Sequence, residues 1–211
     1  MQLVTFQHNG PAKPGAIVGD NIIGFQAAGF STLLHLIQGG SEALQRIKTL
    51  LDNPPKDEIV PLAKVQLLAP LSNPPKIICV GLNYHDHALE CNEEIPKVAT
   101  LFSKYTTSII GPGEAIVLPK NSKEPDYEAE LAVVIGKGGR YISKDRWRDH
   151  VFGYTNLNDV SARDYQAATS QWMVGKTFDT FAPMGPAIVT ADEIADPQAL
   201  DIHSESRLCV A

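Results

Sequence analysis

The segment Asp126–Val134 (DYEAELAVV) places acidic side chains at every second position at the start of an apolar run. Residues two apart in a β-strand share a face, so Asp126, Glu128 and Glu130 would point one way and the residues between them the other. Like charges on one half-buried face destabilise a strand unless a cation or hydrogen-bond donors compensate them. The segment therefore predicts either a solvated acidic edge strand or a site for a hard divalent cation such as Mg²⁺, which accepts carboxylate oxygens.

Composition excludes several classes of protein. The 211 residues are 44% hydrophobic and 20% charged, as in an ordinary globular protein of one or two domains. The formal net charge of −6 argues against nucleic acid or an anionic membrane as a partner. No apolar run approaches the roughly 18–20 residues that a membrane span needs. The first ten residues, MQLVTFQHNG, lack the basic and apolar regions of a secretory signal.

Cysteine usage indicates a reducing compartment. Cys79, Cys91 and Cys209 are odd in number and widely spaced, which favours neither a disulfide framework nor a zinc site. Cys79 stands in the apolar run IICV and is expected to be a small core residue. We therefore expect a cytoplasmic protein.

Proline-rich joints divide the chain into two predicted units. Residues 1–69 indicate a small N-terminal α/β domain and linker, with strand-like residues at 17–25 and helices at 31–38 and 41–52. Pro54 and Pro55 end the second helix. A second proline-rich stretch opens the main body, residues 70–211.

The main body alternates short β-rich segments with glycine and proline. Strands are expected at 77–81, 108–111, 115–119, 130–136, 152–158 and 186–190, and helices at 86–91, 143–151 and 161–168. Ser161 and Asp164 fit a capping box for the last of these helices. Many strands with few crossover helices favour a mainly β, antiparallel or mixed architecture of the α+β class.

Four polar motifs occur in the order Gly81–Glu90, Asp126–Glu130, Asn158–Gln166 and Gly175–Asp179. Together they resemble the fumarylacetoacetate hydrolase family, in its branch of acylpyruvate hydrolases, oxaloacetate decarboxylases and hydroxymuconate isomerases. The resemblance covers roughly residues 70 to 202. It implies a mixed β-roll preceded by a small N-terminal α/β domain.

The resemblance assigns a metal site. Glu128 and Glu130 match the two glutamates of the family's site and Asp159 matches its third carboxylate, which implies Mg²⁺ or Mn²⁺ as cofactor. Taken alone, Asp159 would be interpreted first as a helix-cap or turn aspartate. Arg163 would either hold these carboxylates in place or form an ordinary surface ion pair.

The resemblance also assigns residues to chemistry. Lys176 matches the family's active-site lysine, whose ammonium would stabilise a developing enolate or oxyanion. Gln166 matches a glutamine that binds substrate, although a solvated surface amide is an equal alternative.

His87 and Glu90 match a histidine–glutamate pair that the family carries on a mobile lid. Their i, i+3 spacing puts them on one helical face, where the glutamate can orient the imidazole for acid–base work. A zinc site formed by His85 and His87 would require a strand there, and the following Ala-Leu-Glu argues against one.

The predicted function is that of a divalent-metal-dependent enzyme acting on a small 2-oxo acid or 1,3-dicarbonyl compound through a metal-stabilised enolate. Carbon–carbon bond hydrolysis, decarboxylation and isomerisation all remain open, and the family implies a homodimer. The alternative is an inactive fragment or a non-catalytic metal-binding module. After Ile202 the sequence HSESRLCVA departs from the continuation that the resemblance implies, so we expect a catalytic unit that is incomplete at its C-terminal end.

Overall fold

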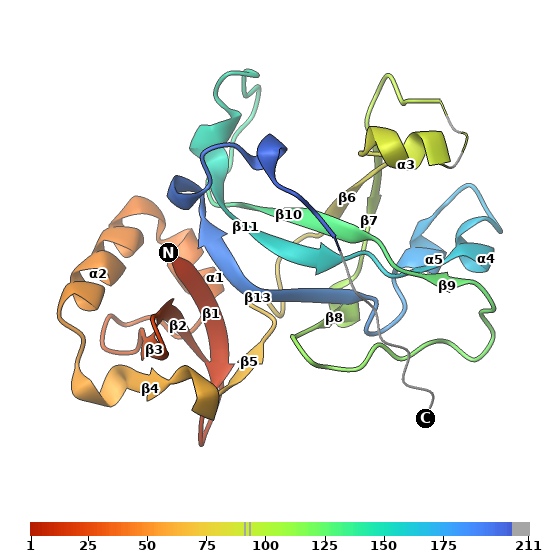
Figure 1. Ribbon diagram of the computed structural model, residues 1–211. Helices are drawn as coiled ribbons and strands as arrows, with labels where there is room; N and C mark the ends of the chain where they lie inside the picture. The colour runs from red at the N-terminus through yellow and green to blue at the C-terminus, as the bar shows by residue number, and fades with distance from the viewer. Residues whose placement is uncertain (91, 93, 204–211) are drawn as a thin grey trace.

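A nine-stranded sheet runs through the molecule in the computed structural model, which describes residues 1–90, 92 and 94–203 (Figure 1). Two of its strands pair with inner strands, β5 (Gln66–Leu68) antiparallel to β1 (Gln2–Gln7) and β8 (Ile109–Ile110) parallel to β13 (Ala182–Thr190). The other seven strands lie side by side in the order β10 (Ala129–Ile135), β11 (Val151–Asn158), β13 (Ala182–Thr190), β1 (Gln2–Gln7), β2 (Lys13–Val18), β3 (Asn21–Gly24) and β4 (Ile59–Pro61).

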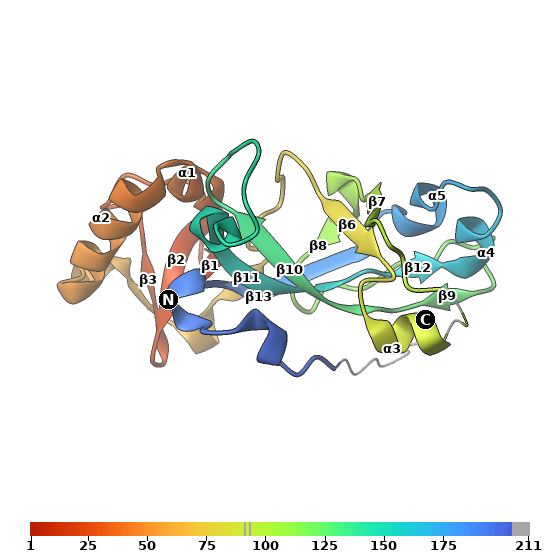
Figure 2. The same ribbon diagram turned by 90° about the horizontal axis from the view of Figure 1, so that it is seen from above.

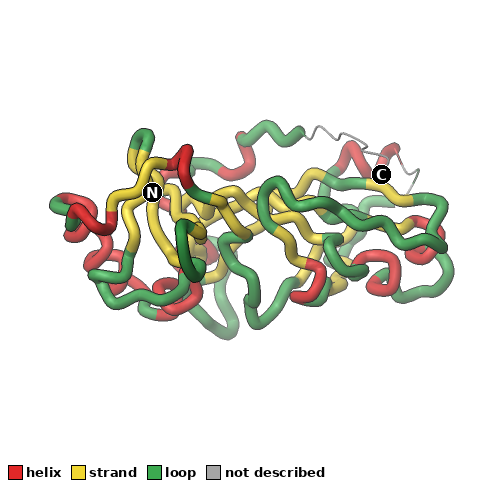
Figure 3. The backbone as a smooth tube through the Cα atoms, turned by 90° about the horizontal axis from the view of Figure 1, so that it is seen from below, coloured by secondary structure: helices red, strands yellow, loops and turns green. Residues whose placement is uncertain are grey.

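Smaller elements lie around this sheet. Strands β6 (Ile78–Gly81) and β7 (Thr100–Ser103) form one two-stranded sheet, and β9 (Pro125–Asp126) and β12 (Ser161–Ala162) form another. Figure 2 shows the labelled α-helices at the two ends of the molecule with the long strands between them, and Figure 3 shows the strands running through its middle. The helices are α1 (Leu33–Gln38), α2 (Gly40–Asp52), α3 (His85–Glu90), α4 (Arg163–Gln166) and α5 (Met173–Lys176).

The N-terminal helices form where the sequence supplies an end signal and an apolar face. Thr32 begins α1, because its hydroxyl accepts a hydrogen bond from the His35 amide at 3.1 Å. Gly40, at φ +59°, turns the chain from α1 into α2 in a conformation that suits glycine. Ile47, on the inner face of α2, is completely buried. Both helices were expected from the sequence, and both are confirmed.

Strand β1 joins the N-terminal strands to those of the main body. It pairs antiparallel with β13, where Leu3 lies opposite Ile188, and on its other side with β2. One hydrophobic core accordingly draws on both parts of the chain, with Phe25 and Leu36 from the first and Phe152 and Ile188 from the second. Strands from both sides of residue 69 belong to this single sheet. The division of the chain into two domains at that residue stays a prediction.

The predicted fold class is confirmed, with local corrections. The strand expected at 115–119 is wrong: no strand forms there, and the Val117 amide binds the Thr180 hydroxyl at 2.8 Å. The helix expected at 143–151 is only a 3₁₀ turn, Trp147–His150. Residues 204–211, on which the expectation of an incomplete C-terminal end partly rests, lie outside the described residues, as do Cys91 and Cys209.

The capping box at the fourth helix is also wrong. Ser161 lies in β12, opposite Asp126 of β9, and its hydroxyl donates to the Asp159 carbonyl at 2.9 Å. Asp164 instead accepts hydrogen bonds from the Ser122 hydroxyl and the Lys123 amide. Because strand pairing holds Ser161 extended, α4 begins only at Arg163.

No helix in the described part of the chain has the length and apolar character needed to cross a membrane.

Replacing Phe25 tests the shared core. Phe25 is fully buried in the cluster that joins α1 and α2 to the sheet, so Phe25→Ala leaves a cavity there. We expect the free energy of unfolding to fall by about 3–5 kcal/mol, measured by urea denaturation. Val18→Ala, at a side chain that is 46% exposed, should change it by less than about 1 kcal/mol. Equal losses in the two variants would contradict the assigned core.

Candidate active site

Two strand ends bring the predicted carboxylates together. Strands β10 and β11 are antiparallel, so the residue before β10 and the residue after β11 meet at one edge. There the Asp159 amide donates to the Glu128 carbonyl at 3.0 Å, and the Asn158 side chain accepts from the Glu128 amide at 3.1 Å. The Asp126–Glu130 and Asn158–Asp159 motifs, some thirty residues apart in sequence, are thereby fixed side by side.

Lys176 lies between two of these carboxylates. Its Nζ is 2.9 Å from Glu128 Oε2 and 3.0 Å from Asp159 Oδ2, and the residue is only 2% exposed. Gly175 makes this position possible, because a Cβ there would lie 2.5 Å from the Gln166 amide nitrogen and 2.6 Å from the Ala162 carbonyl oxygen. The Gly-Lys pair therefore lets α5 pack directly against α4 and directs the lysine inward.

A second buried lysine, Lys104, was not identified from the sequence. It directly follows β7, and its Nζ lies 2.5 Å from Asp159 Oδ1 and 3.1 Å from the Val160 carbonyl oxygen. Burial lowers the pKa of Lys104, and the adjacent Asp159 opposes that shift. A single lysine after a strand gives no pattern from which this contact could be predicted.

Arg163 organises the outer side of the cluster. One guanidinium nitrogen is 2.7 Å from Glu128 Oε1 and another is 2.7 Å from Asp126 Oδ2. Burial by itself would raise the pKa of Glu128, but Lys176 and Arg163 outweigh it and lower that pKa. Gln166 joins the same group, since its side-chain oxygen accepts a hydrogen bond from Arg163 at 3.0 Å.

Glu130 is the least compensated carboxylate of the group. Burial and the charges of Glu128 and Asp159 raise its pKa from 4.5 to about 7. In the described part of the chain it makes no ion pair, although the Tyr84 hydroxyl lies beside it. The pKa of Tyr84 is itself raised, by burial and by Glu130.

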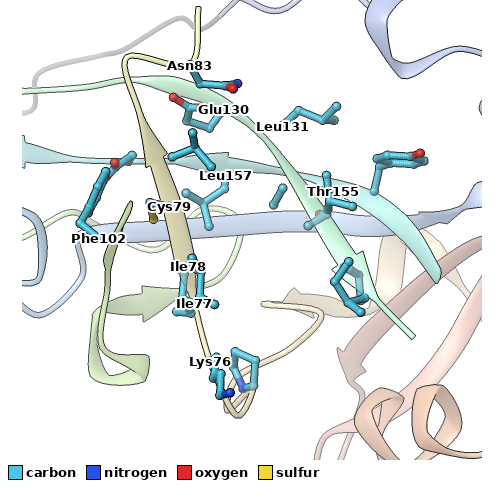
Figure 4. Close-up of a pocket in the computed structure, with 18 of the residues that line it drawn as sticks. Lys76, Ile77, Ile78, Cys79, Asn83, Phe102, Glu130, Leu131, Thr155 and Leu157 are labelled. Atoms are coloured by element: carbon cyan, nitrogen blue, oxygen red, sulfur yellow. The ribbon is translucent and has the colours of Figure 1, made fainter. Parts of the chain in front are cut away.

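One cavity of about 2110 Å³ collects most of the predicted residues. In Figure 4 Glu130 lies near one end of the labelled residues, Lys76 lies at the other end, and Cys79 and Phe102 lie between them. Burial and then Asp159 raise the pKa of Cys79 to about 12, so its thiol stays protonated. The wall includes His87, Glu128, Glu130, Asp159, Gln166 and Lys176.

The histidine–glutamate pair lies on α3 as its spacing predicts. His87 Nδ1 is 3.9 Å from Glu90 Oε2 across one helical turn. His87 faces the cavity, while Glu90 is 82% exposed on the outer side. Because α3 is helical, His85 and His87 do not share a strand face, and the zinc alternative has no support.

The carboxylates fit a hard cation by chemistry, although none of the described His, Cys, Asp and Glu residues form a group of three close enough to hold one. The Lys176 ammonium instead occupies the space between Glu128 and Asp159. Four carboxylates, with Asp126 included, meet three cationic side chains there, which leaves one negative charge in excess when Glu130 is ionised. Oxygen donors with an uncompensated charge are the environment that Mg²⁺ or Mn²⁺ prefers.

The β-rich fold, the acidic residues at the strand ends and the buried lysine occur in a chain that matches a known protein family. The family described as "Fumarylacetoacetate (FAA) hydrolase C-terminal" matches residues 76–206. The chain therefore belongs to the fumarylacetoacetate hydrolase family, as its motifs predicted. It is 46% identical over 212 residues to the protein named mitochondrial oxaloacetate tautomerase fahd2 of Xenopus laevis, and the match covers 96% of this chain and 66% of that protein. A rat relative, named mitochondrial oxaloacetate tautomerase Fahd2a, is 43% identical with the same coverage.

Solved structures agree in fold. The fumarylacetoacetate hydrolase of Exiguobacterium antarcticum superposes with a TM-score of 0.79 at 36% identity, covering 93% of this chain and 69% of that one. A maleylpyruvate hydrolase from Sphingobium sp. SYK-6, in complex with manganese(II) ion and pyruvate, gives 0.75 at 31% identity, covering 93% and 70%. The chain thus spans about two thirds of the length of these relatives.

The raised pKa of Glu130 predicts a pH-dependent stability. Between about pH 4.5 and 7 the folded protein holds a proton that the unfolded chain releases, so the free energy of unfolding of metal-free protein should fall as the pH rises through this range. Urea denaturation with a chelator present measures it. Glu130→Gln, which mimics the protonated carboxyl, should remove this part of the pH dependence. Parallel profiles for the two proteins would contradict the assignment.

Proposed function

We propose that this protein is a divalent-metal-dependent enzyme that acts on a small 2-oxo acid or 1,3-dicarbonyl compound. One observation carries the proposal: Glu128, Glu130 and Asp159 meet at adjacent strand ends in the wall of a cavity, with the Lys176 ammonium buried among them. Membership of the fumarylacetoacetate hydrolase family supports it. So does the Sphingobium maleylpyruvate hydrolase, a relative of the same fold that is in complex with manganese(II) ion and pyruvate.

Glu128, Glu130 and Asp159 would hold the cation, which we propose to be Mg²⁺ or Mn²⁺. When bound, the ion supplies Lewis-acid stabilisation of negative charge on the substrate oxygens. Asp126 is not among these ligands, because its carboxylate faces Arg163. Arg163 also pairs with Oε1 of Glu128, whereas Lys176 pairs with Oε2 of the same carboxylate.

Lys176 and Gln166 would contact the substrate. The lysine ammonium is a mobile donor whose bonds to Glu128 and Asp159 can be exchanged for one to a developing oxyanion. Gln166 directs its carbonyl oxygen to Arg163, which leaves its NH₂ group free to donate to a substrate carboxylate or carbonyl. Both side chains line the same cavity.

His87 would move the proton. His87 lines the cavity, where its imidazole would take a proton from a substrate carbon or from water and return it. The exposed carboxylate of Glu90 would orient the ring.

Among the possible reactions we place keto–enol tautomerisation of oxaloacetate first. The Xenopus and rat relatives bear this activity in their names, and it needs only the proton transfer that His87 can perform. Incubating manganese-loaded protein with oxaloacetate, acylpyruvates and hydroxymuconates, and following enol absorbance and products, tests the choice. Metal binding without turnover of any of these compounds would favour the non-catalytic alternative.

We further propose that the protein forms a homodimer and works in a reducing compartment, with cytoplasm as the first choice. The Xenopus and rat relatives are named mitochondrial, so cell fractionation is the deciding experiment. Light scattering after size exclusion tests the dimer.

Neutralising one ligand tests the metal site. Glu128→Gln removes a charged oxygen donor, so Mn²⁺ affinity measured by calorimetry should fall by about 10-fold or more. Glu124→Gln, the same chemical change at an exposed position four residues earlier, should leave the affinity as it is. Equal affinities in the two variants would remove Glu128 from the site.

Replacing the histidine separates chemistry from metal binding. His87→Ala should lower turnover by a factor of about 10²–10⁴, as for loss of a general base, while Mn²⁺ affinity is retained. His85→Ala, at an exposed position on the same helix, should leave turnover unchanged. A parallel loss of metal in His87→Ala would mean that the imidazole is a ligand.

A further inference from the structure

The two oxygens of Asp159 face two different lysines. Lys176 Nζ is 3.0 Å from Oδ2, and Lys104 Nζ is 2.5 Å from Oδ1. Each oxygen therefore has its own ammonium partner. These two lysines differ in how firmly they are held.

Lys104 is fixed at Asp159. Its side chain is completely buried, and its second hydrogen bond goes to the Val160 carbonyl oxygen, so both acceptors belong to the same turn after β11. It makes no ion pair with Glu128 or Glu130. Lys104 consequently ties the end of β7 to this turn.

Lys176 is held differently, because it is shared between Glu128 and Asp159. Both of these residues are proposed metal ligands, so a cation that binds them must displace the Lys176 ammonium. Displacement frees Asp159 Oδ2 but leaves Oδ1 with Lys104. Asp159 can then bind the cation through Oδ2 alone.

We propose that Lys104 is a positioning residue that reserves Oδ1 of Asp159 and thereby selects Mg²⁺ or Mn²⁺ over Ca²⁺. The inference rests on the proposed metal site. Ca²⁺ takes 6–8 oxygen ligands and often binds both oxygens of a carboxylate, whereas Mg²⁺ requires six ligands in a tighter octahedron. A carboxylate limited to one oxygen suits the smaller ions and deprives Ca²⁺ of a ligand.

The ratio of Mn²⁺ to Ca²⁺ affinity, measured by calorimetry on the full chain, is the appropriate readout. Lys104→Met removes a positive charge, which strengthens the binding of every divalent cation, but the ratio cancels that effect. We expect the ratio to fall about tenfold or more in Lys104→Met, because Asp159 can then offer both oxygens. Lys104→Arg, which keeps the donors and the charge, should retain the wild-type ratio.

Lys76→Met serves as the matched control. Lys76 lines the same cavity but lies at the opposite end of the labelled residues from Glu130, so its loss changes the charge of the cavity without freeing an oxygen of Asp159 (Figure 4). Its ratio should equal that of the wild type. An unchanged ratio in Lys104→Met, with circular dichroism confirming its fold, would overturn the role of Lys104.

A crystal structure of the wild-type protein with Mn²⁺ gives a test that needs no variant. We expect Asp159 Oδ1 to remain within hydrogen-bond distance of Lys104 Nζ, with only Oδ2 on the metal. Both oxygens on the metal would overturn the inference, whether or not Lys104→Met folds. Failure of the wild type to bind any divalent cation would instead refute the proposed metal site itself.

Discussion

The pairing of buried ammonium groups with Asp159 joins three distant parts of the chain. Lys104 reaches the aspartate from the end of β7, Lys176 reaches it from α5, and Asp159 itself lies just after β11. All three residues are at most 3% exposed, so each charge depends on the others for compensation. Loss of Asp159 would leave the Lys104 ammonium buried without an ion pair, whereas loss of either lysine would leave Asp159 with one ammonium partner in place of two.

The sequence predicted the parts of this site that follow a local period, and the structure brings them together. Alternation in Asp126–Glu130 directs Glu128 and Glu130 towards the cavity, and the spacing of His87 and Glu90 yields their contact across one turn of α3. Their roles in binding and catalysis stay predictions. Fold class followed from the many short strands and was correct, because strand alternation is also a local signal.

What the sequence missed depends on contacts between distant segments. In the sequence, Lys104 is one polar residue after a strand. Its contact with Asp159 forms only because the β6–β7 sheet packs over that aspartate. The capping box failed because pairing of Ser161 with β9, a tertiary contact, determines the backbone conformation there. The need for glycine at position 175 likewise arises from the packing of α4 against α5. A glycine before a lysine is common in loops, so the sequence alone does not reveal it.

The pairing of β1 with β13 has a consequence for the order of folding. Gln2 lies opposite Val189 in the sheet, so β1 waits for a strand that is made almost two hundred residues later. Contacts of such long sequence separation slow folding, because the entropy of closing the loop is lost before the pairing stabilises it. During synthesis β5 can cover the Thr5–Gln7 part of this edge of β1 early, while Gln2 and Leu3 stay open until β13 has been made.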